Sequence, residues 1–303
     1  MISVIIATYN GETVLPKTLQ ALSLLEVPSQ GVEFIIVDNA SIDNTVNILS
    51  KYADKLEFKI LHEAKQGKSH AIHKGLEHAT GDLIVFSDDD VLPDKNWLIA
   101  YINAAAEQLD YSVFLGQIRP YWLAPAKDWL IKLANEGRVC GCTSKALAEG
   151  EASIYWAKGA NFCIRKNVLN QVSFRNDLWV AGKNEVGGED TDFVKKASEK
   201  GFQLWFVPEA LLQHIIRPHE MTMLGIWKRY FRIGRSIAAI TPQEKFDGVK
   251  ILGYPRWFLL KVFKQCLSLI INAVKLNSYC FASQLIETAI SCGQEYHYKH
   301  SGL

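Results

Sequence analysis

Short apolar runs alternate with amphipathic segments through the first third of the chain. The runs that predict strands are SVIIAT (residues 3–8), EFIIVD (33–38), FKIL (58–61) and LIVFS (83–87). Between them, patterns typical of helices cover residues 14–25, begin near Asp43, and cover residues 69–79. Apolar strands separated by helices indicate a parallel sheet that is covered on both faces. The pattern therefore predicts a doubly wound α/β domain.

The pattern becomes mixed after residue 112. Short strands are predicted at FLGQI and ANFCIR, then a Gly-rich acidic turn at 186–190, a helix from Thr191 to about Lys200, and the strand QLWFV. Beyond Pro218 the chain is predicted to be helical. We interpret residues 1–112 and 113–215 as two halves of one domain, and residues 216–303 as a C-terminal helical extension.

Polar side chains follow three of the predicted strands. They are Thr8, Tyr9 and Asn10, then Asp38 and Asn39, then Asp88, Asp89 and Asp90. Ligands bind beyond the carboxyl ends of the strands in doubly wound sheets. These strand ends are therefore the first candidates for a site.

Composition excludes a disordered or fibrous protein, because 49% of the 303 residues are hydrophobic and 21% are charged. The net charge is +1, but residues 216–303 carry twelve Lys and Arg against five Asp and Glu, a charge of +7 that leaves −6 for residues 1–215. This asymmetry indicates an anionic surface or ligand near the C-terminal part. We expect no nucleic-acid partner.

The cysteines and the N-terminus predict a cytoplasmic protein. The six cysteines have no paired CxxC spacing, so reduced thiols are the simpler interpretation than a structural zinc site. The first residues, MISVIIATYN, lack the basic region that begins a signal peptide.

Three consecutive carboxylates, Asp88 to Asp90, end a buried strand. Clustered carboxylates repel one another, and a divalent cation that bridges phosphates would neutralise them; Mg²⁺ and Mn²⁺ both prefer such oxygen ligands. A solvated acidic turn is the alternative interpretation.

Four segments resemble, in this order, the motif series of family 2 glycosyltransferases: SVIIATYNG, IIVDNASIDNT, QGKSHAIHKGLEHATGDLIVFSDDD and GGEDTDF. The resemblance runs from Ser3 to about His214. It implies a GT-A type fold, a Rossmann-like doubly wound mixed sheet, and inverting transfer of a sugar from a nucleotide-diphosphate donor to an acceptor hydroxyl. Polysaccharide, lipopolysaccharide or other glycoconjugate assembly is the implied setting.

The resemblance also implies a donor site. Tyr9 would stack on the base, Asp38 would hydrogen-bond the nucleobase or ribose, and Asp88 would bind the ribose. The residues that it places at the donor are Thr8, Tyr9, Asn10, Glu12, Asp38, Lys68, Asp88 and Asp89. A half-buried core aromatic remains the alternative for Tyr9.

On the acceptor side, the resemblance assigns Asp190 as the general base and Glu189 as the residue that orients the acceptor. A helix N-cap is the alternative role for Asp190. The segment WAKGAN, residues 156–161, resembles the acceptor-pocket segment of the family and supplies Trp156, Gly159 and Asn161 as candidate sugar contacts.

The implied cofactor is a divalent metal, Mn²⁺ or Mg²⁺, held by Asp90 with Asp88 and completed by His214. A surface or core histidine is the alternative for His214. The sequence departs from the family at Asn39 and Ala40, where an Asp-Gly-Ser type turn is usual, and this leaves the base of the donor open.

Three other classes of protein fit the sequence less well. Gln66 to Ser69 superficially suggests a phosphate loop, but the Walker pattern needs glycine where His62 stands. A nucleotidyltransferase would need a basic, Gly-rich loop after the first strand, which ATYNGE lacks. A silent, membrane-associated scaffold has little reason to keep Asp38, Asp88, Asp90 and Asp190 together.

Residues 257–276 combine a broad apolar face with a narrow polar stripe. The longest uncharged run, 265–274, is shorter than a spanning helix needs. Two interpretations remain: a helix packed on the catalytic domain, or an interfacial helix in peripheral contact with anionic lipid at the inner face of the cytoplasmic membrane. The second would suit a lipid-linked acceptor, and the expected acceptor is either a carbohydrate or a lipid-linked molecule.

Overall fold

The computed structural model describes residues 1–176, 186–241, 250–251 and 254–300. The chain divides into two compact units. Unit 1 contains residues 1–121, 134–181 and 189–216, and unit 2 contains residues 122–133, 182–188 and 217–303. The segment 122–133 belongs to unit 2 although it lies far from the C-terminal helices in sequence.

Unit 1 is built on a nine-stranded sheet with the order β3-β2-β1-β4-β8-β6-β9-β5, and β7 pairs with β9. Strands β1, β2, β3 and β4 are parallel, whereas β8 runs antiparallel to β4. The predicted doubly wound mixed sheet is therefore confirmed. The strands are β1 Ile2–Thr8, β2 Val32–Asp38, β3 Lys59–His62, β4 Leu83–Asp88, β5 Val91–Pro93, β6 Tyr111–Trp122, β7 Gly150–Glu151, β8 Asn161–Arg165 and β9 Gln203–Ile216.

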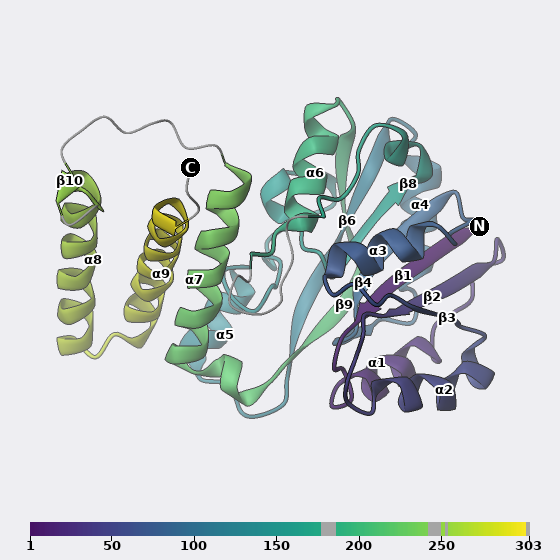
Figure 1. Ribbon diagram of the computed structural model, residues 1–303, viewed down its shortest axis with the longest axis horizontal. Helices are drawn as coiled ribbons and strands as arrows, with labels where there is room; N and C mark the ends of the chain where they lie inside the picture. The colour runs from purple at the N-terminus through teal and green to yellow at the C-terminus, as the bar shows by residue number, and fades with distance from the viewer. Residues whose placement is uncertain (177–185, 242–249, 252–253, 301–303) are drawn as a thin grey trace. The chain divides into compact units, whose positions relative to one another are not determined.

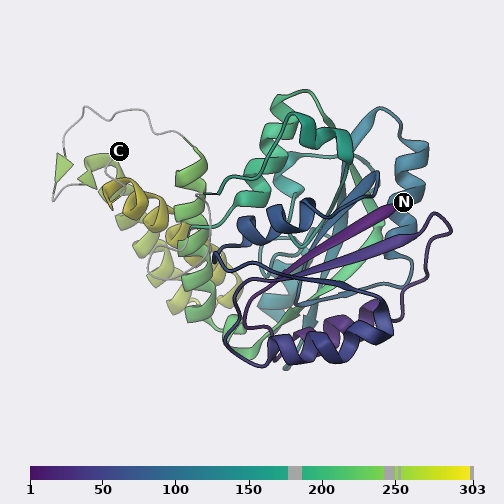
Figure 2. The ribbon, with the colours of Figure 1, turned by 45° about the vertical axis from the view of Figure 1, so that its right-hand side comes forward.

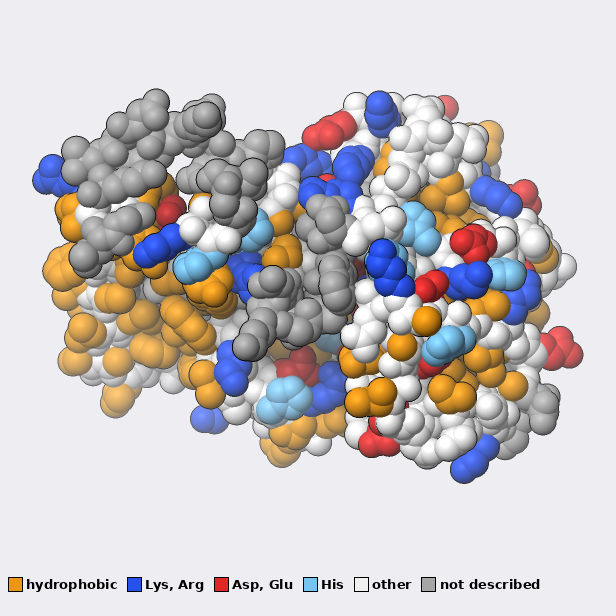
Figure 3. All heavy atoms as spheres, in the orientation of Figure 1, with side chains coloured by type: hydrophobic (Ala, Val, Ile, Leu, Met, Phe, Trp, Pro, Cys, Tyr) orange, Lys and Arg blue, Asp and Glu red, His pale blue; other side chains and the backbone are white. Residues whose placement is uncertain are grey.

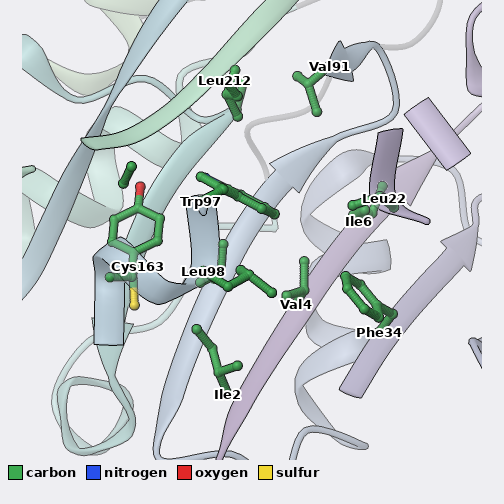
Figure 4. Packing of buried hydrophobic residues seen from close by; sticks show 14 of the residues in the cluster. Ile2, Val4, Ile6, Leu22, Phe34, Val91, Trp97, Leu98, Cys163 and Leu212 are labelled. Atoms are coloured by element: carbon green, nitrogen blue, oxygen red, sulfur yellow. The ribbon is translucent and has the colours of Figure 1, made fainter. Parts of the chain in front are cut away.

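Helices cover both faces of this sheet. Helices α1 (Leu15–Leu22), α2 (Thr45–Leu56) and α4 (Trp97–Glu107) contribute to one hydrophobic core, and α3 (Lys68–Leu76) and α6 (Glu189–Glu199) contribute to the other. Figures 1 and 2 show α1 and α2 on the face of the sheet opposite α3. Strand β1 serves both cores, because Val4 faces the first and Ile5 the second. Figure 4 shows Val4 packed in the first core.

Strand register brings the polar strand ends together. Thr8 pairs with Asp38 of β2, and on its other side β1 pairs Ala7 with Asp88 of β4. Because these strands are parallel neighbours, all three end at one edge of the sheet. The acids of β2 and β4 therefore flank the end of β1.

Unit 2 is mainly helical, as expected for the C-terminal extension. It contains most of α5 (Asp128–Asn135), together with α7 (Met223–Ile240), α8 (Arg256–Val274) and α9 (Ser278–His300), and the short strands β10 (Lys250–Ile251) and β11 (Tyr254–Pro255) pair with each other. Helices α7 and α9 approach closely at two glycines. A Cβ atom at Gly234 would overlap the carbonyl oxygen of Ile290, and one at Gly293 would overlap that of Phe231.

Two element boundaries differ from the predictions. Strand β9 continues to Ile216, so His214 lies within the strand and pairs with Val91 instead of following it. Helix α6 begins at Glu189, so Glu189 and Asp190 occupy its first turn instead of preceding it. Carboxylates are favoured there because the first turn of a helix carries partial positive charge.

The turn after β2 contains a non-glycine residue in a left-handed conformation. Ala40 has φ of 61° at the position where glycine is usual in the resembled family. A left-handed backbone costs a residue with a Cβ atom about 1–2 kcal/mol. The loop is held in this conformation by its neighbours, since Asp38 Oδ1 accepts a hydrogen bond from the Ser41 amide at 3.3 Å.

We predict that Ala40→Gly raises the free energy of unfolding by about 0.5–1 kcal/mol, because relief of the left-handed strain exceeds the entropic cost of glycine. Urea unfolding measures this change. The matched control is Ala21→Gly in α1, where the same replacement should lower stability by about 0.5–1 kcal/mol. A loss of stability in both variants would contradict the strain at Ala40.

Candidate active site

A pocket of about 200 Å³ lies at the edge of the sheet where β1 and β4 end. The loop between β3 and α3 closes one side of it. Its lining residues are Ala7, Thr8, Tyr9, Asn39, Gln66, Gly67, Lys68, Asp88 and Asp89. Of the residues that the sequence assigned to the donor, the structure therefore brings Thr8, Tyr9, Lys68, Asp88 and Asp89 to one wall.

Tyr9 stands at the pocket wall with 45% of its surface exposed, and it belongs to neither hydrophobic core. Its hydroxyl accepts a hydrogen bond from Gln66 Nε2 at 3.2 Å. An exposed aromatic ring beside a pocket of nucleoside size is suited to stacking on a base. Gln66 is a wall residue that sequence reasoning did not assign.

Three predicted donor residues lie outside the pocket lining. Asp38 is only 2% exposed, and its Oδ2 lies 3.0 Å from His62 Nδ1. Asn10 and Glu12 tie the β1–α1 loop to the β2–α2 loop, because Asn10 Oδ1 accepts from the Ile42 amide and Glu12 Oε2 accepts from the Asn44 amide. Their contacts assign these two side chains to loop packing.

Asn39 organises the loop that covers the pocket. Its Nδ2 donates to the carbonyl oxygens of Glu63 and Lys65, at 3.1 and 2.8 Å, and its Oδ1 accepts from the Gly67 amide at 2.6 Å. An aspartate could not donate to either carbonyl. The departure from the usual Asp-Gly-Ser turn is therefore matched by a different set of hydrogen bonds.

The Asp88–Asp90 turn is held by a residue of α1 and by the last residue of β1. The hydroxyl of Thr18 donates to the Asp89 carbonyl at 2.7 Å and accepts from the Val91 amide at 3.2 Å. Thr8 donates to Asp89 Oδ2 at 2.5 Å. Asp89 is therefore engaged with the protein. Thr18 carries no sequence signal beyond its place on the buried face of α1.

The ammonium of Lys68 lies among three carboxylates. Its Nζ is 2.7 Å from Asp88 Oδ1, 3.1 Å from Asp190 Oδ2 and 3.9 Å from Glu189 Oε1. We call these four residues the Lys68 cluster. It joins the pocket wall to the first turn of α6, so the donor and catalytic residues predicted from sequence meet at one side chain.

Charge and burial shift the pKa values of the Lys68 cluster. Burial raises the pKa of Glu189 to about 7, helped by the neighbouring Asp190 and opposed by Lys68. Burial likewise raises the pKa of Asp190, again opposed by Lys68. Although burial acts in the other direction, the surrounding acids, Asp190 above all, hold the pKa of Lys68 well above its usual value.

Two oxygens of the acid pair are buried without a hydrogen-bond partner among the described residues: Glu189 Oε2 and Asp190 Oδ1. A buried acceptor that lacks a donor is costly unless a ligand supplies one. Gly159 allows Asp190 to lie where it does, because a Cβ atom at Gly159 would overlap the Asp190 carboxylate. An acceptor hydroxyl is the kind of donor that these oxygens lack.

In the WAKGAN segment, Asn161 does not have the acceptor contact that was expected of it. Asn161 is 1% exposed, its Oδ1 accepts from Trp97 Nε1 and the Tyr101 hydroxyl, and its Nδ2 donates to the carbonyls of Gln117 and Ala210. All four hydrogen-bonding positions of the amide are used inside the protein, so Asn161 is a structural residue and not an acceptor contact. Trp156 packs its ring against Phe206, edge to face, and remains partly exposed.

Asp90 and His214 face one another, with Asp90 Oδ2 and His214 Nε2 3.4 Å apart. His214 Nδ1 lies 2.7 Å from the Cys140 carbonyl oxygen, which can only accept, so Nδ1 carries a proton. The lone pair of a neutral imidazole is then at Nε2, on the side of Asp90, an orientation typical of metal-ligating histidines. The alternative of a surface histidine does not fit, since His214 is buried.

These two side chains fit a divalent cation that is completed by other oxygens. Among the described residues, no three His, Cys, Asp or Glu side chains gather as a metal site. Mg²⁺ is commonly bound through one or two protein carboxylates plus substrate phosphates. Asp88, expected to share the metal, is instead engaged by Lys68 at 2.7 Å.

A doubly wound mixed sheet with acids at the strand ends defines the chain as an α/β protein of the GT-A type. The family model described as Glycosyl transferase family 2 matches residues 3–176, more than half of the sequence. The chain belongs to this family. Membership decides against the nucleotidyltransferase interpretation.

Two curated relatives illustrate the match. The probable glycosyltransferase YdaM of Bacillus subtilis is 27% identical over 220 residues, covering 69% of this chain and 49% of the relative. The succinoglycan biosynthesis protein ExoM of Rhizobium meliloti is 26% identical over 239 residues, covering 78% of this chain and 74% of the relative. The chain thus spans about half the length of YdaM.

Among solved structures, the mannosyltransferase PcManGT from Pyrobaculum calidifontis, in complex with GDP-Man and Mn²⁺, matches with a TM-score of 0.65. The match covers 96% of this chain and 86% of that one, at 17% sequence identity. At this identity the likeness establishes the GT-A fold.

We predict that Asn39→Asp weakens the pocket loop, because a carboxylate would face the Glu63 and Lys65 carbonyls without a proton to donate. The free energy of unfolding should fall by about 1–3 kcal/mol, and the affinity for a nucleotide-sugar should fall with it. Thermal unfolding with and without donor measures both. The control is Asn47→Asp on the exposed face of α2; equal effects of the two replacements would contradict the role of Asn39.

Proposed function

We propose that the chain is an inverting glycosyltransferase that moves a sugar from a nucleotide-diphosphate donor to an acceptor hydroxyl, in the assembly of a polysaccharide or other glycoconjugate. The observation that carries the proposal is the Lys68 cluster, where a buried acid pair adjoins a pocket of nucleoside size. ExoM, a relative named for succinoglycan biosynthesis, supports the biosynthetic setting.

In this proposal the donor enters at the ends of β1 and β4. Its base stacks on Tyr9, and its ribose lies by Asp88 on the pocket wall. Asp38, which is buried and held by His62, would act by fixing the loop beside the base. Lys68 lines the pocket and would meet the diphosphate.

Asp190 would act as the general base. Its carboxylate would take the proton of the acceptor hydroxyl as that oxygen forms a bond to the anomeric carbon. The bond between that carbon and the diphosphate oxygen breaks in the same displacement, which releases the nucleoside diphosphate and inverts the stereochemistry. Glu189, whose Oε2 is buried without a partner among the described residues, would accept a hydrogen bond from the acceptor.

Asp90 and His214 would hold a divalent cation, Mn²⁺ or Mg²⁺, in this proposal. The bound cation would neutralise the negative charge that develops on the leaving diphosphate. The Nδ1–H bond from His214 to the Cys140 carbonyl keeps Nε2 directed at Asp90. PcManGT, which shares the fold, was solved with Mn²⁺.

We also propose a cytoplasmic location, with peripheral membrane contact through residues 257–276 and a carbohydrate or lipid-linked acceptor. Among the described residues, one helix, α8, is long and apolar enough to cross a membrane by length and composition alone. Lys261 and Lys264 interrupt its first half, which favours surface contact over a spanning position.

The assignment of roles predicts opposite defects for two acid-to-amide variants. Asp190→Asn should keep donor binding and lower the transfer rate about 10²–10⁴-fold, because the base is lost. Asp90→Asn should abolish the stabilisation that Mn²⁺ adds to donor binding. Thermal shift with UDP-, GDP- and dTDP-sugars, with and without Mn²⁺, and a transfer assay measure these effects. Equal Mn²⁺-dependent stabilisation in Asp90→Asn and the parent would reject the metal assignment.

The pKa values predict the pH dependence of transfer. The base must be deprotonated, and burial raises the pKa of both acids, that of Glu189 to about 7. Because burial raises the pKa of the base Asp190, kcat/KM should rise with pH above the range of an ordinary aspartate, and the deprotonation of Glu189 at about 7 should add to that rise. Lys68 lowers both pKa values, so Lys68→Met should move this rise to higher pH.

The control for this shift is Lys74→Met. Lys74 lies on the same helix but pairs with the exposed Glu77 at 2.9 Å. The Lys74→Met variant should therefore show the same pH profile as the parent protein. A profile in Lys68→Met that loses height without moving along the pH axis would contradict the electrostatic role of Lys68.

A further inference from the structure

The outer face of α8 in unit 2 is a stripe of large apolar side chains. Phe263 is 67% exposed and Val274 78%. Figure 3 shows hydrophobic side chains gathered over α8, on the left of the view. We call this surface the α8 stripe; its residues are Trp257, Leu260, Phe263, Leu267, Ile270, Ile271 and Val274. At 3.6 residues per turn these positions fall on one side of the helix.

The opposite side of α8 packs on α9. Phe258 is buried, and Gln265 Nε2 donates to Ser291 Oγ of α9 at 3.4 Å. A spanning orientation would carry the neighbouring α9, with Glu287 and Glu295, into the hydrocarbon region, which is costly. An orientation in the plane of the membrane leaves α9 outside it. The packing therefore favours a helix that lies on a bilayer.

The charges on α8 itself are positive, and Glu295 of α9 lies near Lys261. Arg256, Lys261, Lys264 and Lys275 lie on α8 or at its end, and α8 has no Asp or Glu. By helical spacing the three lysines run along one edge of the α8 stripe. Long lysine side chains at such an edge can reach the headgroups while the apolar residues enter the acyl region. The surface is thus complementary to an anionic bilayer.

A pocket of about 650 Å³ opens at the corner between α8 and α9. Lys275, Asn277, Ser278 and Tyr279 line it from the corner, and Trp129, Lys132 and the acidic Asp128 line it from α5. Lys132 Nζ sits 4.1 Å from the centre of the Tyr279 ring, a contact with a neutral group that leaves its charge in place. Two ammonium groups beside amide and hydroxyl groups suit a phosphate.

Leu276 links the pocket to the stripe. It follows the last turn of α8 with φ of 52°, a left-handed conformation that glycine would adopt without strain, and 88% of its surface is exposed. A strained residue that holds an apolar side chain in solvent is destabilising in the isolated protein. Burial in a bilayer would offset that cost.

We propose that the α8 stripe lies in the surface of an anionic bilayer and that the corner pocket binds the phosphate of a lipid headgroup. The inference rests on the proposed membrane contact and adds the lipid chemistry that this contact recognises. Lys132 and Lys275 contact the phosphate, while Leu276 enters the acyl region beside it.

Vesicle flotation of the full chain tests the pocket. Vesicles of phosphatidylcholine with phosphatidylglycerol should bind the protein, and vesicles of phosphatidylcholine alone should bind it far less. Lys132→Gln with Lys275→Gln should weaken binding about 25-fold, since each lysine near an anionic surface contributes about fivefold. The control, Lys17→Gln with Lys51→Gln, removes the same charge from exposed lysines that lie outside the proposed contact, and it should change binding much less.

Two further variants test the apolar contact. Phe263→Ser with Leu267→Ser should weaken binding at least about tenfold. Leu276→Gly should weaken binding about tenfold while raising the melting temperature of the free protein, a combination that general damage to the fold would not produce. Equal binding of Leu276→Gly and the parent would contradict its place in the bilayer.

Other occupants give different results, and each would overturn the proposal. Retention in membranes during alkaline carbonate extraction would indicate a spanning helix. A lipid-free dimer that Leu267→Ser converts to a monomer would indicate a second copy on the stripe. Stabilisation by inorganic phosphate through Lys132 and Lys275, without binding to anionic vesicles, would indicate a soluble phosphate ligand.

A measurement of donor binding distinguishes a failure of the proposed membrane site from a failure of the proposed function. All variants of unit 2 should keep the thermal stabilisation by nucleotide-sugar, because none of them alters the pocket of unit 1. Loss of flotation with intact donor stabilisation would reject the membrane site alone. Flotation without any donor stabilisation in the parent protein would reject the transferase assignment alone.

Discussion

The ion pairs of Lys68 hold together groups that would otherwise repel. Asp88, Glu189 and Asp190 each place an oxygen within 4 Å of its ammonium. Burial alone drives the acid pair toward the protonated form, since the pKa of Glu189 rises to about 7 despite the nearby cation. Removal of the cation from a buried ion pair is strongly destabilising, because the carboxylate is then left buried without a compensating charge. The architecture of the site therefore depends on one side chain at the start of α3.

The same interaction joins two acids that lie far apart in the sequence. Asp88 belongs to the pocket wall, whereas Asp190 belongs to the first turn of α6. An incoming diphosphate would compete with these acids for Lys68. Movement of the ammonium toward the diphosphate would leave Asp190 with less positive charge nearby, and its basicity would increase. Donor binding and activation of the base would then be two consequences of one displacement.

Much of the fold of unit 1 could be predicted, because the hydrophobic patterns that define its strands and helices are local in the sequence. Apolar strands and amphipathic helices alternate in sequence, and parallel order alone brings Thr8, Asp38 and Asp88 to one edge of the sheet. The family motifs added Asp190, and its Oδ2 lies 3.1 Å from Lys68 Nζ. The same reasoning could not show that segment 122–133 belongs to unit 2, since that depends on contacts distant in sequence.

Amide side chains were harder to assign, since the direction of an amide is set by partners from other segments. Asn161 sits in a segment that resembles an acceptor pocket, yet Trp97, Tyr101, Gln117 and Ala210 use its whole hydrogen-bonding capacity. Asn39 replaces an acid of the usual motif because two carbonyls of the β3–α3 loop need a donor. The loop that leads into Lys68 thus depends on a departure from the family pattern. A comparison of motifs reads Asn39 as a lost acid, whereas the hydrogen bonds show that its amide positions the residue on which the carboxylate cluster depends.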